Sequence, residues 1–191
     1  MYKHCKIFKP AEIRGLSQIY HRHKQKARFH KRLLNVFNVH KLEWYHLRES
    51  QKINQPISIL DPINNITKLT LLETYFLEYT PGSFTHIHRD FLGGISVVTL
   101  IENNNLVGGQ NIFYVKKEEH PEVCPVVVDL SVGDSIIYKT EMLHGVSEVF
   151  SGSRLVLISW FGNEKMYDNK KHLMSNLPPT GAPFNKVIGI E

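Results

Sequence analysis

Cysteine is scarce in this sequence. Only Cys5 and Cys124 occur, and they lie far apart in the chain without forming a CxxC pair. This scarcity argues against a disulfide framework of the kind that small secreted proteins use, and against a structural zinc site built on thiolates. A reducing compartment suits such a chain, and we predict that the protein is cytoplasmic.

Long apolar segments are also missing. No stretch approaches the roughly 20 apolar residues that cross a bilayer, and residues 1–6 lead into no apolar run of signal-peptide length. We therefore expect neither membrane insertion nor secretion. The 191 residues, of which 42% are hydrophobic and 21% are charged, are typical of a soluble globular chain. At this length we predict a single domain over residues 1–191.

Positive charge exceeds negative charge, with a formal net charge of +5, and the basic excess is concentrated in residues 20–34. A basic segment of this kind suits a nucleic acid or an acidic partner. No zinc-finger or RNA-recognition motif accompanies it, however, and the solvated face of a helix is the simpler interpretation. We therefore predict no nucleic-acid partner.

The first third of the chain, residues 1–67, has the pattern of a mostly helical support. Pro10 suits the first turn of a helix, and a mixed apolar and charged run follows it through Lys24. Residues 33–52 carry apolar side chains at spacings that also indicate an amphipathic helix. We therefore predict a helical layer beside the rest of the domain.

From residue 68 to residue 162 the pattern changes to short runs rich in β-branched and aromatic residues. Turn-forming pairs such as Gly108-Gly109 and Gly133-Asp134 separate these runs. Many short strands at this spacing predict a sandwich, jelly roll or barrel. Residues 163–191 lose the periodicity and are predicted to be an irregular tail. The predicted fold class is therefore mainly β with N-terminal helices.

A candidate metal site begins at the triplet His88-Arg89-Asp90. Residues two apart on a strand point to the same face, so one imidazole and one carboxylate can reach a single ion. His144 follows the apolar run 135–138 much later in the chain. Two histidines and one carboxylate form the facial triad that holds non-haem iron(II), and they leave three positions for a bidentate co-substrate and dioxygen.

His86 offers an alternative first pair of ligands, because it shares a strand face with His88. An H-x-H pair would then replace the H-x-D pair. We prefer His88 and Asp90, since hydroxylase chemistry requires the carboxylate, and we leave His86 for the substrate or the rim of the site.

Arg154 lies on the next predicted strand, ten residues beyond His144. A hairpin between these two strands would bring its guanidinium into the interior behind the metal. Arginine forms a planar fork that binds a carboxylate with two hydrogen bonds, and a buried arginine needs such a partner. The distal carboxylate of 2-oxoglutarate would supply it. The alternative is an arginine that extends to solvent from the end of a strand.

Other elements surround these residues in a fixed order. Residues 79–84 place a tyrosine and a glycine turn ahead of the triplet, residues 108–113 place a glycine pair before a strand, and residues 132–137 form a turn and strand before His144. In its order and spacing this set resembles the Fe(II)/2-oxoglutarate-dependent dioxygenase superfamily. The resemblance implies that superfamily's fold, a double-stranded β-helix, which is a cupin-like jelly roll.

The resemblance also implies an enzyme. Such a hydroxylase consumes 2-oxoglutarate and dioxygen and releases succinate and CO2, with iron and the co-substrate supplying the oxidising chemistry. Ascorbate is expected as the reductant. Asp90 favours hydroxylation, because related halogenases carry a small residue in place of this carboxylate.

The site residues implied by the resemblance fall into two groups. The catalytic metal ligands are His88, Asp90 and His144. Arg154 anchors the co-substrate, and Tyr79 and Thr99 are further candidate contacts to it. The alternative is that Tyr79 is an ordinary strand aromatic and that Thr99 is an ordinary strand residue.

Two branches of the superfamily share features with the chain. The context of the triplet and residues 143–149 resemble bacterial hydroxylases of free amino acids, whereas residues 154–161 resemble the prolyl 4-hydroxylase branch. We predict a small substrate, a free L-amino acid. The alternatives are a prolyl hydroxylase-like enzyme that acts on a peptide or protein, and a non-catalytic jelly-roll binding module.

Overall fold

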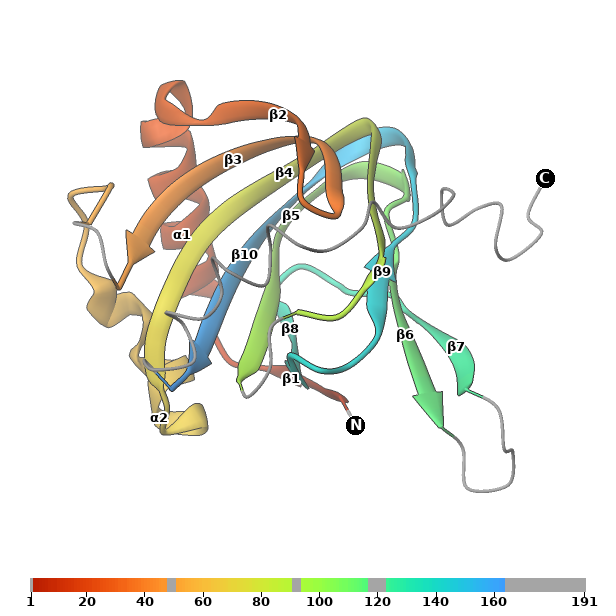
Figure 1. Ribbon diagram of the computed structural model, residues 1–191. Coiled ribbons are helices and arrows are strands. Elements are labelled where there is room, and N and C mark those ends of the chain that lie inside the picture. The colour runs from red at the N-terminus through yellow and green to blue at the C-terminus, as the bar shows by residue number, and fades with distance from the viewer. Residues whose placement is uncertain (1, 48–50, 91–93, 117–122, 164–191) are drawn as a thin grey trace.

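The computed structural model describes residues 2–47, 51–90, 94–116 and 123–163, which fold mainly into strands (Figure 1). In chain order the elements are β1 (Tyr2–Lys6), α1 (Pro10–His23), η1 (Lys24–Lys26), β2 (Arg28–Leu33), β3 (Val36–His46), η2 (Ile57–Leu60), α2 (Asp61–Thr67), β4 (Thr70–His88), β5 (Ile95–Gly108), β6 (Asn111–Lys116), β7 (Val123–Val128), β8 (Asp134–Lys139), β9 (His144–Val146) and β10 (Val149–Gly162). The predicted mainly β fold is confirmed. No helix in these ranges is long and apolar enough to span a membrane. Apart from Asn163, the predicted tail lies outside the described residues.

The predicted helix over residues 33–52 is wrong, because this segment contains strand β3 instead. Val39 and Lys41 face the interior between the strands, whereas Leu42 and Trp44 face α1. Since β3 buries side chains on both faces, its apolar residues do not follow a simple alternation, and their spacing imitates that of a helix. The basic segment, residues 20–34, does not form one helix face either. It is divided among the end of α1, the 3-10 helix η1 and strand β2.

Helix α1 is confirmed from Pro10 to His23. The backbone N–H of Lys9 donates a hydrogen bond to Glu12 at 2.6 Å, which caps the first turn. Leu16 and Tyr20 are buried on one face of the helix, where they join the core cluster of the sheet. In Figure 1 the helix lies behind β3, β4 and β10, so it covers the outer face of this part of the sheet.

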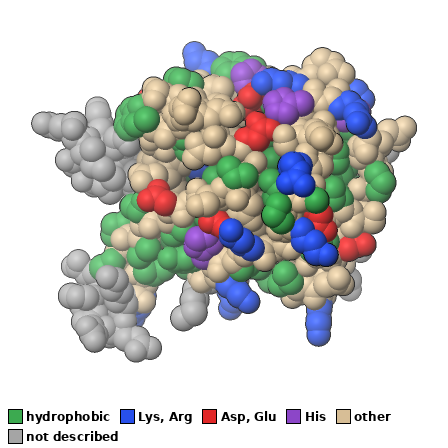
Figure 2. Space-filling view, turned by 180° about the vertical axis from the view of Figure 1, so that it is seen from behind, with side chains coloured by type: hydrophobic (Ala, Val, Ile, Leu, Met, Phe, Trp, Pro, Cys, Tyr) green, Lys and Arg blue, Asp and Glu red, His purple; other side chains and the backbone are tan. Residues whose placement is uncertain are grey.

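The outward side of α1 carries mixed charge. Figure 2 views the molecule from this side, and its Lys and Arg side chains are separated by acidic, histidine and apolar ones. His21 lies 2.8 Å from a carboxylate oxygen of Glu102, and Lys24 lies 2.8 Å from one of Glu78. Carboxylates therefore interrupt the basic residues at this end of the helix.

The strands form one curled antiparallel sheet of ten members, in the order β1-β8-β5-β10-β4-β9-β6-β7, with β3 paired to β4 and β2 paired to β3. In Figure 1, β2, β3, β4, β10 and β5 lie side by side in one layer, while β9, β6 and β7 lie in another. This is the jelly-roll arrangement, in which a single sheet curls so that two layers enclose an interior.

Strand β4 connects the two layers. Its first part pairs with β10, and its last residue, His88, pairs with His144 of β9. Gly82, with φ at 82°, lies between these parts, where a residue without Cβ accommodates the positive φ at low cost. The Gly82 carbonyl accepts a hydrogen bond from Asn38 Nδ2 at 2.8 Å. One strand thus carries Tyr79 in the first layer and His88 in the second.

The alternation along β10 separates two cores. Leu155, Leu157 and Phe161 pack with α1, whereas Val156 and Ile158 pack between the two layers. Successive side chains of a strand point to opposite faces, so the cluster beside α1 is distinct from the cluster around the interior. The site described below lies in the second cluster.

Because the two cores are distinct, a substitution in the core beside α1 should lower the stability of the protein and affect the site less. Leu16 has no exposed surface. We expect Leu16→Ala to lower the free energy of unfolding by about 2–5 kcal/mol, as is usual for a cavity in a packed core. Urea unfolding measures this change.

Ile66→Ala is the matched control, because half of the Ile66 side chain is exposed. Its effect should stay within about 0.5 kcal/mol. Equal losses in the two variants would contradict the assignment of Leu16 to the core.

Candidate metal centre

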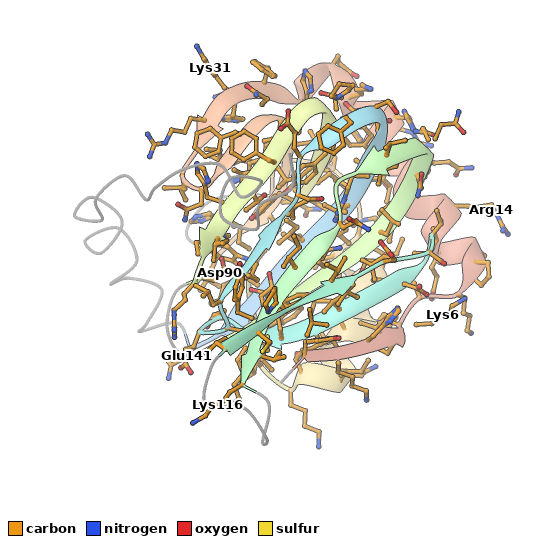
Figure 3. All side chains as sticks on the ribbon, turned by 90° about the vertical axis from the view of Figure 1, so that its right-hand side faces the viewer. Lys6, Arg14, Lys31, Asp90, Lys116 and Glu141 are labelled. Carbon is orange, nitrogen blue, oxygen red and sulfur yellow. The ribbon has the colours of Figure 1, made fainter. Side chains whose placement is uncertain are left out.

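The structure brings His88, Asp90 and His144 together. His88 ends β4, His144 begins β9, and these two residues are paired directly across the strands. Asp90 follows two residues after His88, and one potential ligand atom from each of the three residues lies within 4.8 Å of the others. Figure 3 shows Asp90 on the far side of the sheet from Arg14 of α1. The predicted ligands therefore form one group inside the jelly roll.

Backbone carbonyls orient the two imidazoles. The His88 Nδ1–H donates to the His86 carbonyl at 2.8 Å, and the His144 Nδ1–H donates to the Met142 carbonyl at 2.8 Å. With Nδ1 protonated in each ring, Nε2 remains available as the ligand atom. Nε2 of His88 lies 3.2 Å from one Asp90 oxygen, and Nε2 of His144 lies 3.7 Å from the other. The donor set suits a divalent ion.

The charge states also suit a metal. Burial alone would raise the pKa of Asp90, but His144, His88 and the Ser96 hydroxyl together outweigh it and hold this pKa below its usual value. Ser96 Oγ donates to Asp90 at 2.8 Å. Burial lowers the pKa of His144, which favours the neutral ring. A charged carboxylate and a neutral imidazole are the forms that bind metal.

His86 does not join this group. Its ring instead makes edge contacts with Phe37 and Phe84, at centroid distances of 4.7 and 5.1 Å. Within the described residues, the group that could hold a metal contains His88, Asp90 and His144 without His86. The H-x-D pair is therefore favoured over the H-x-H pair.

Arg154 is buried, with 3% of its surface exposed, on the interior face of β10. Its guanidinium donates to the Gly109 carbonyl and, at 3.3 Å, to Asn111 Oδ1. Its Nε has no partner, and no carboxylate of the described residues forms an ion pair with it. Since a buried charge without a counter-charge is costly, this site suits an anionic ligand.

Tyr79 lies beside Arg154. The two residues are paired across β4 and β10, and the guanidinium carbon lies 5.2 Å from the centre of the Tyr79 ring. The Tyr79 hydroxyl forms a hydrogen bond with the Thr85 hydroxyl at 3.0 Å. The structure therefore places the predicted tyrosine and arginine together.

Thr99 was predicted to contact the co-substrate, and the structure contradicts this prediction. Val98, its neighbour on β5, lines the interior cavity, so Thr99 points to the opposite face. There the Thr99 hydroxyl is fully buried and forms a hydrogen bond with the Ser135 hydroxyl at 2.8 Å. Thr99 therefore does not line the cavity.

A single cavity of about 200 Å³ joins these groups. The three metal-ligand candidates, Arg154 and Tyr79 all line it. Its other walls come from the β2–β3 hairpin and from interior positions on β3–β6 and β8–β10: Arg32, Leu33, Leu34, Asn35, Val36, Lys41, Glu73, Tyr75, Leu77, Thr85, Arg89, Val98, Asn111, Phe113, Tyr138, Gly145, Val146, Val156, Ile158 and Trp160.

Sequence reasoning missed several of these polar groups. Tyr138 Oη lies 3.2 Å from His144 Nε2, and Lys41 Nζ lies 3.0 Å from a carboxylate oxygen of Glu73. Tyr75 also lines the cavity, and Lys41 lies over its ring at 4.2 Å. Alternation from Tyr79 would have placed Tyr75 and Glu73 on the interior face, whereas no sequence signal marked Lys41 or Tyr138.

The chain matches no family model and no curated protein. It does match solved structures. A prolyl-4-hydroxylase from Pseudomonas putida has a TM-score of 0.62 at 18% identity, with 85% of this chain and 92% of that chain covered. An oxidoreductase of the 2OG-Fe(II) oxygenase family from Burkholderia pseudomallei has a TM-score of 0.67 at 14% identity, with 84% and 85% covered.

The chain has the fold of the 2-oxoglutarate–iron(II) oxygenases. A prolyl hydroxylase from Trichoplax adhaerens, solved with a peptide of the hypoxia inducible factor, also matches, with a TM-score of 0.64 at 13% identity and coverage of 87% and 86%. At such identities the likeness is one of fold. It confirms the predicted jelly roll of this superfamily.

The ligand assignment predicts a selective loss of metal binding. Loss of a hydrogen bond that supports a metal ligand typically lowers metal affinity by about 10–100-fold. Loss of a ligand itself should lower it further, so we expect His144→Ala to weaken Fe(II) binding by more than about 100-fold. Anaerobic calorimetry with Fe(II) measures this affinity.

His86→Ala is the matched control, because His86 lies on the same strand but outside the ligand group. Its Fe(II) affinity should stay within about 3-fold of the wild type. The reverse pattern, with His86→Ala damaging and His144→Ala harmless, would contradict the assignment.

Proposed function

We propose that this protein is an iron(II)- and 2-oxoglutarate-dependent oxygenase that hydroxylates a small substrate. The observation that carries the proposal is the buried guanidinium of Arg154, which has no counter-charge among the described residues and shares one cavity with the His–Asp–His group. A ligand that is anionic at one end and binds a metal at the other would satisfy both groups. 2-Oxoglutarate has this chemistry.

The residues present fit both groups. His88, Asp90 and His144 would hold iron on one face and leave the opposite positions for other ligands. Arg154 would bind the distal carboxylate of 2-oxoglutarate, with Tyr79 beside it. When bound, iron and 2-oxoglutarate supply the oxidising chemistry with dioxygen, and succinate and CO2 are released.

The chain's own part is to position these groups and exclude water. Leu77 and Val156 occupy the row of the sheet next to Arg154 and line the cavity with apolar surface. Burial raises the pKa of both Tyr75 and Tyr138 well above the usual value, so their hydroxyls stay protonated as hydrogen-bond donors. Apolar walls beside the reacting groups suit a reaction that water would interrupt.

The size of the cavity favours a small substrate. Its volume of about 200 Å³ is below the range of roughly 300–1,000 Å³ that is usual for small-molecule sites, and it would also hold iron and 2-oxoglutarate, which leaves little room for a large substrate. We therefore propose a free L-amino acid as the substrate, with ascorbate as the reductant that keeps iron ferrous. We also propose a cytoplasmic location on the ground of the low cysteine content.

A peptide or protein hydroxylase is the second candidate function. Strand β2 pairs with β3 alone among the described strands, so its other edge is available to an extended peptide. Arg32 and Leu33 at the end of β2 also line the cavity, which would bring such a peptide to its mouth. The similar proteins from P. putida and T. adhaerens are prolyl hydroxylases.

Succinate release tests the proposal directly. The protein is incubated under air with Fe(II), ascorbate and 2-oxoglutarate, together with pooled free amino acids, with proline-rich peptides, or with neither. We expect stimulation by the amino acids that is lost in His144→Ala. Stimulation by peptides alone would favour the second candidate. If the protein binds neither Fe(II) nor 2-oxoglutarate, the non-catalytic binding module becomes the better interpretation.

Arg154→Gln should separate co-substrate binding from metal binding. Hydrogen bonds to charged groups contribute roughly 1.5–3 kcal/mol, so we expect 2-oxoglutarate to bind the Fe(II) protein about 10- to 150-fold more weakly. Anaerobic titration measures both affinities, and that for Fe(II) should change far less.

Thr99→Val is the matched control. It removes a hydroxyl of similar burial whose side chain faces away from the cavity. Its 2-oxoglutarate affinity should stay within about 2-fold of the wild type, although its stability should fall. An equal loss in both variants would contradict the role given to Arg154.

A further inference from the structure

Two arginines that line the cavity have no acidic partner among the described residues. Arg32 lies at the end of β2, and Arg89 lies between His88 and Asp90, and both are exposed. Arg32 Nε donates to the Leu34 carbonyl at 3.3 Å, and Arg89 Nη1 donates to the Glu141 carbonyl at 3.2 Å. Among the residues that the structure describes, neither guanidinium forms an ion pair with a carboxylate.

The other charges of the cavity have partners. Lys41 is paired with Glu73 at 3.0 Å, and Asp90 belongs to the metal-ligand group. Under the proposed function, Arg154 would bind the distal carboxylate of 2-oxoglutarate. The other charged side chains of the cavity wall therefore have a partner or a proposed ligand, whereas Arg32 and Arg89 do not.

The net charge of the loaded site follows from these residues. Four cationic side chains, those of Arg32, Lys41, Arg89 and Arg154, and two carboxylates, those of Glu73 and Asp90, line the cavity. One iron(II) ion and one 2-oxoglutarate dianion add no net charge. Two positive charges remain, and a concave site with an excess of one sign attracts ligands of the opposite sign.

Both arginines lie near the end of β4. Arg89 is next to two of the metal ligands in the chain. The Arg32 guanidinium lies over the Phe37 ring at 5.5 Å, and this ring contacts His86, two residues before His88, at 4.7 Å. A group held by these arginines would therefore lie near the end of β4, the segment that leads into His88 and Asp90.

We propose that Arg32 and Arg89 select a small substrate that carries a carboxylate. This inference rests on the proposed function and names the residues that would bind the carboxylate of its substrate. The guanidinium fork matches a carboxylate in geometry and charge. Holding the carboxylate at the cavity wall leaves the carbon chain of the substrate to reach the metal, so the arginines are specificity-determining residues.

Matched substrate pools test the charge requirement. Succinate release is measured with pooled free amino acids, with small hydroxy and dicarboxylic acids, and with the corresponding amino-acid amides, which lack the carboxylate. We expect turnover with a carboxylate pool to exceed turnover with the amides by roughly 10-fold or more. Equal or faster turnover of the amides would overturn the inference.

Charge reversal tests the two residues. The Arg32→Glu/Arg89→Glu double variant should raise KM for the carboxylate substrate by roughly 10-fold or more, and it should raise KM more than it lowers kcat. Arg32→Lys/Arg89→Lys should restore part of the affinity. Because exposed charges are screened, added salt should raise KM in the wild type more than in the glutamate variant. A KM that is unchanged in the glutamate variant would overturn the inference.

Lys31→Glu is the matched control, since Lys31 is an exposed neighbour of Arg32 on β2 that does not line the cavity. Its KM should stay within about 2-fold of the wild type. Turnover with none of the pools, while Fe(II) and 2-oxoglutarate still bind, would overturn the carboxylate substrate and leave the proposed function standing. Loss of that binding in the wild-type protein would instead refute the proposed function itself.

Discussion

The candidate site depends on one constraint, which is the buried guanidinium of Arg154. The described residues offer it the Gly109 carbonyl and the Asn111 amide oxygen, but no carboxylate. A charge held in an apolar interior is tolerated when a ligand completes its coordination. The cavity between the two layers of the jelly roll would therefore suit an anion, and the candidate ligands His88, Asp90 and His144 line the same cavity. The need of Arg154 for an anionic partner therefore links the fold to the proposed chemistry.

Strand β4 makes that arrangement possible. It runs through both layers, so a single backbone carries Tyr79 beside Arg154 and His88 beside His144. Outer contacts then fix each ligand: carbonyls of residues 86 and 142 orient the imidazoles, and Ser96 holds Asp90. Loss of such a contact typically weakens metal binding by about 10–100-fold. Helix α1 packs on the opposite face, which separates structural support from chemistry.

Much of this site was predictable from the sequence, because its parts lie in short local patterns. The H-x-D triplet and the later His144 predicted the group of three candidate ligands, and Arg154 was predicted beside them. The strand pattern predicted a sandwich, jelly roll or barrel, and the resemblance to the dioxygenases selected the jelly roll. The errors came from features that depend on tertiary context. β3 buries both faces and so imitated a helix, and Thr99 was assigned without knowledge of which face of β5 turns inward. Lys41 came from that misassigned segment, so its place in the cavity wall was not foreseeable.

The measurement that tests the central claim most directly is the affinity of 2-oxoglutarate with and without Fe(II), determined by anaerobic calorimetry. If one end of the ligand binds Arg154 and the other binds the metal held by His88, Asp90 and His144, the two affinities are coupled. We predict one binding site per chain and a 2-oxoglutarate affinity that is at least about 10-fold higher with Fe(II) present. Equal affinities with and without the metal, or no binding in either case, would contradict the claim that the two groups form one site.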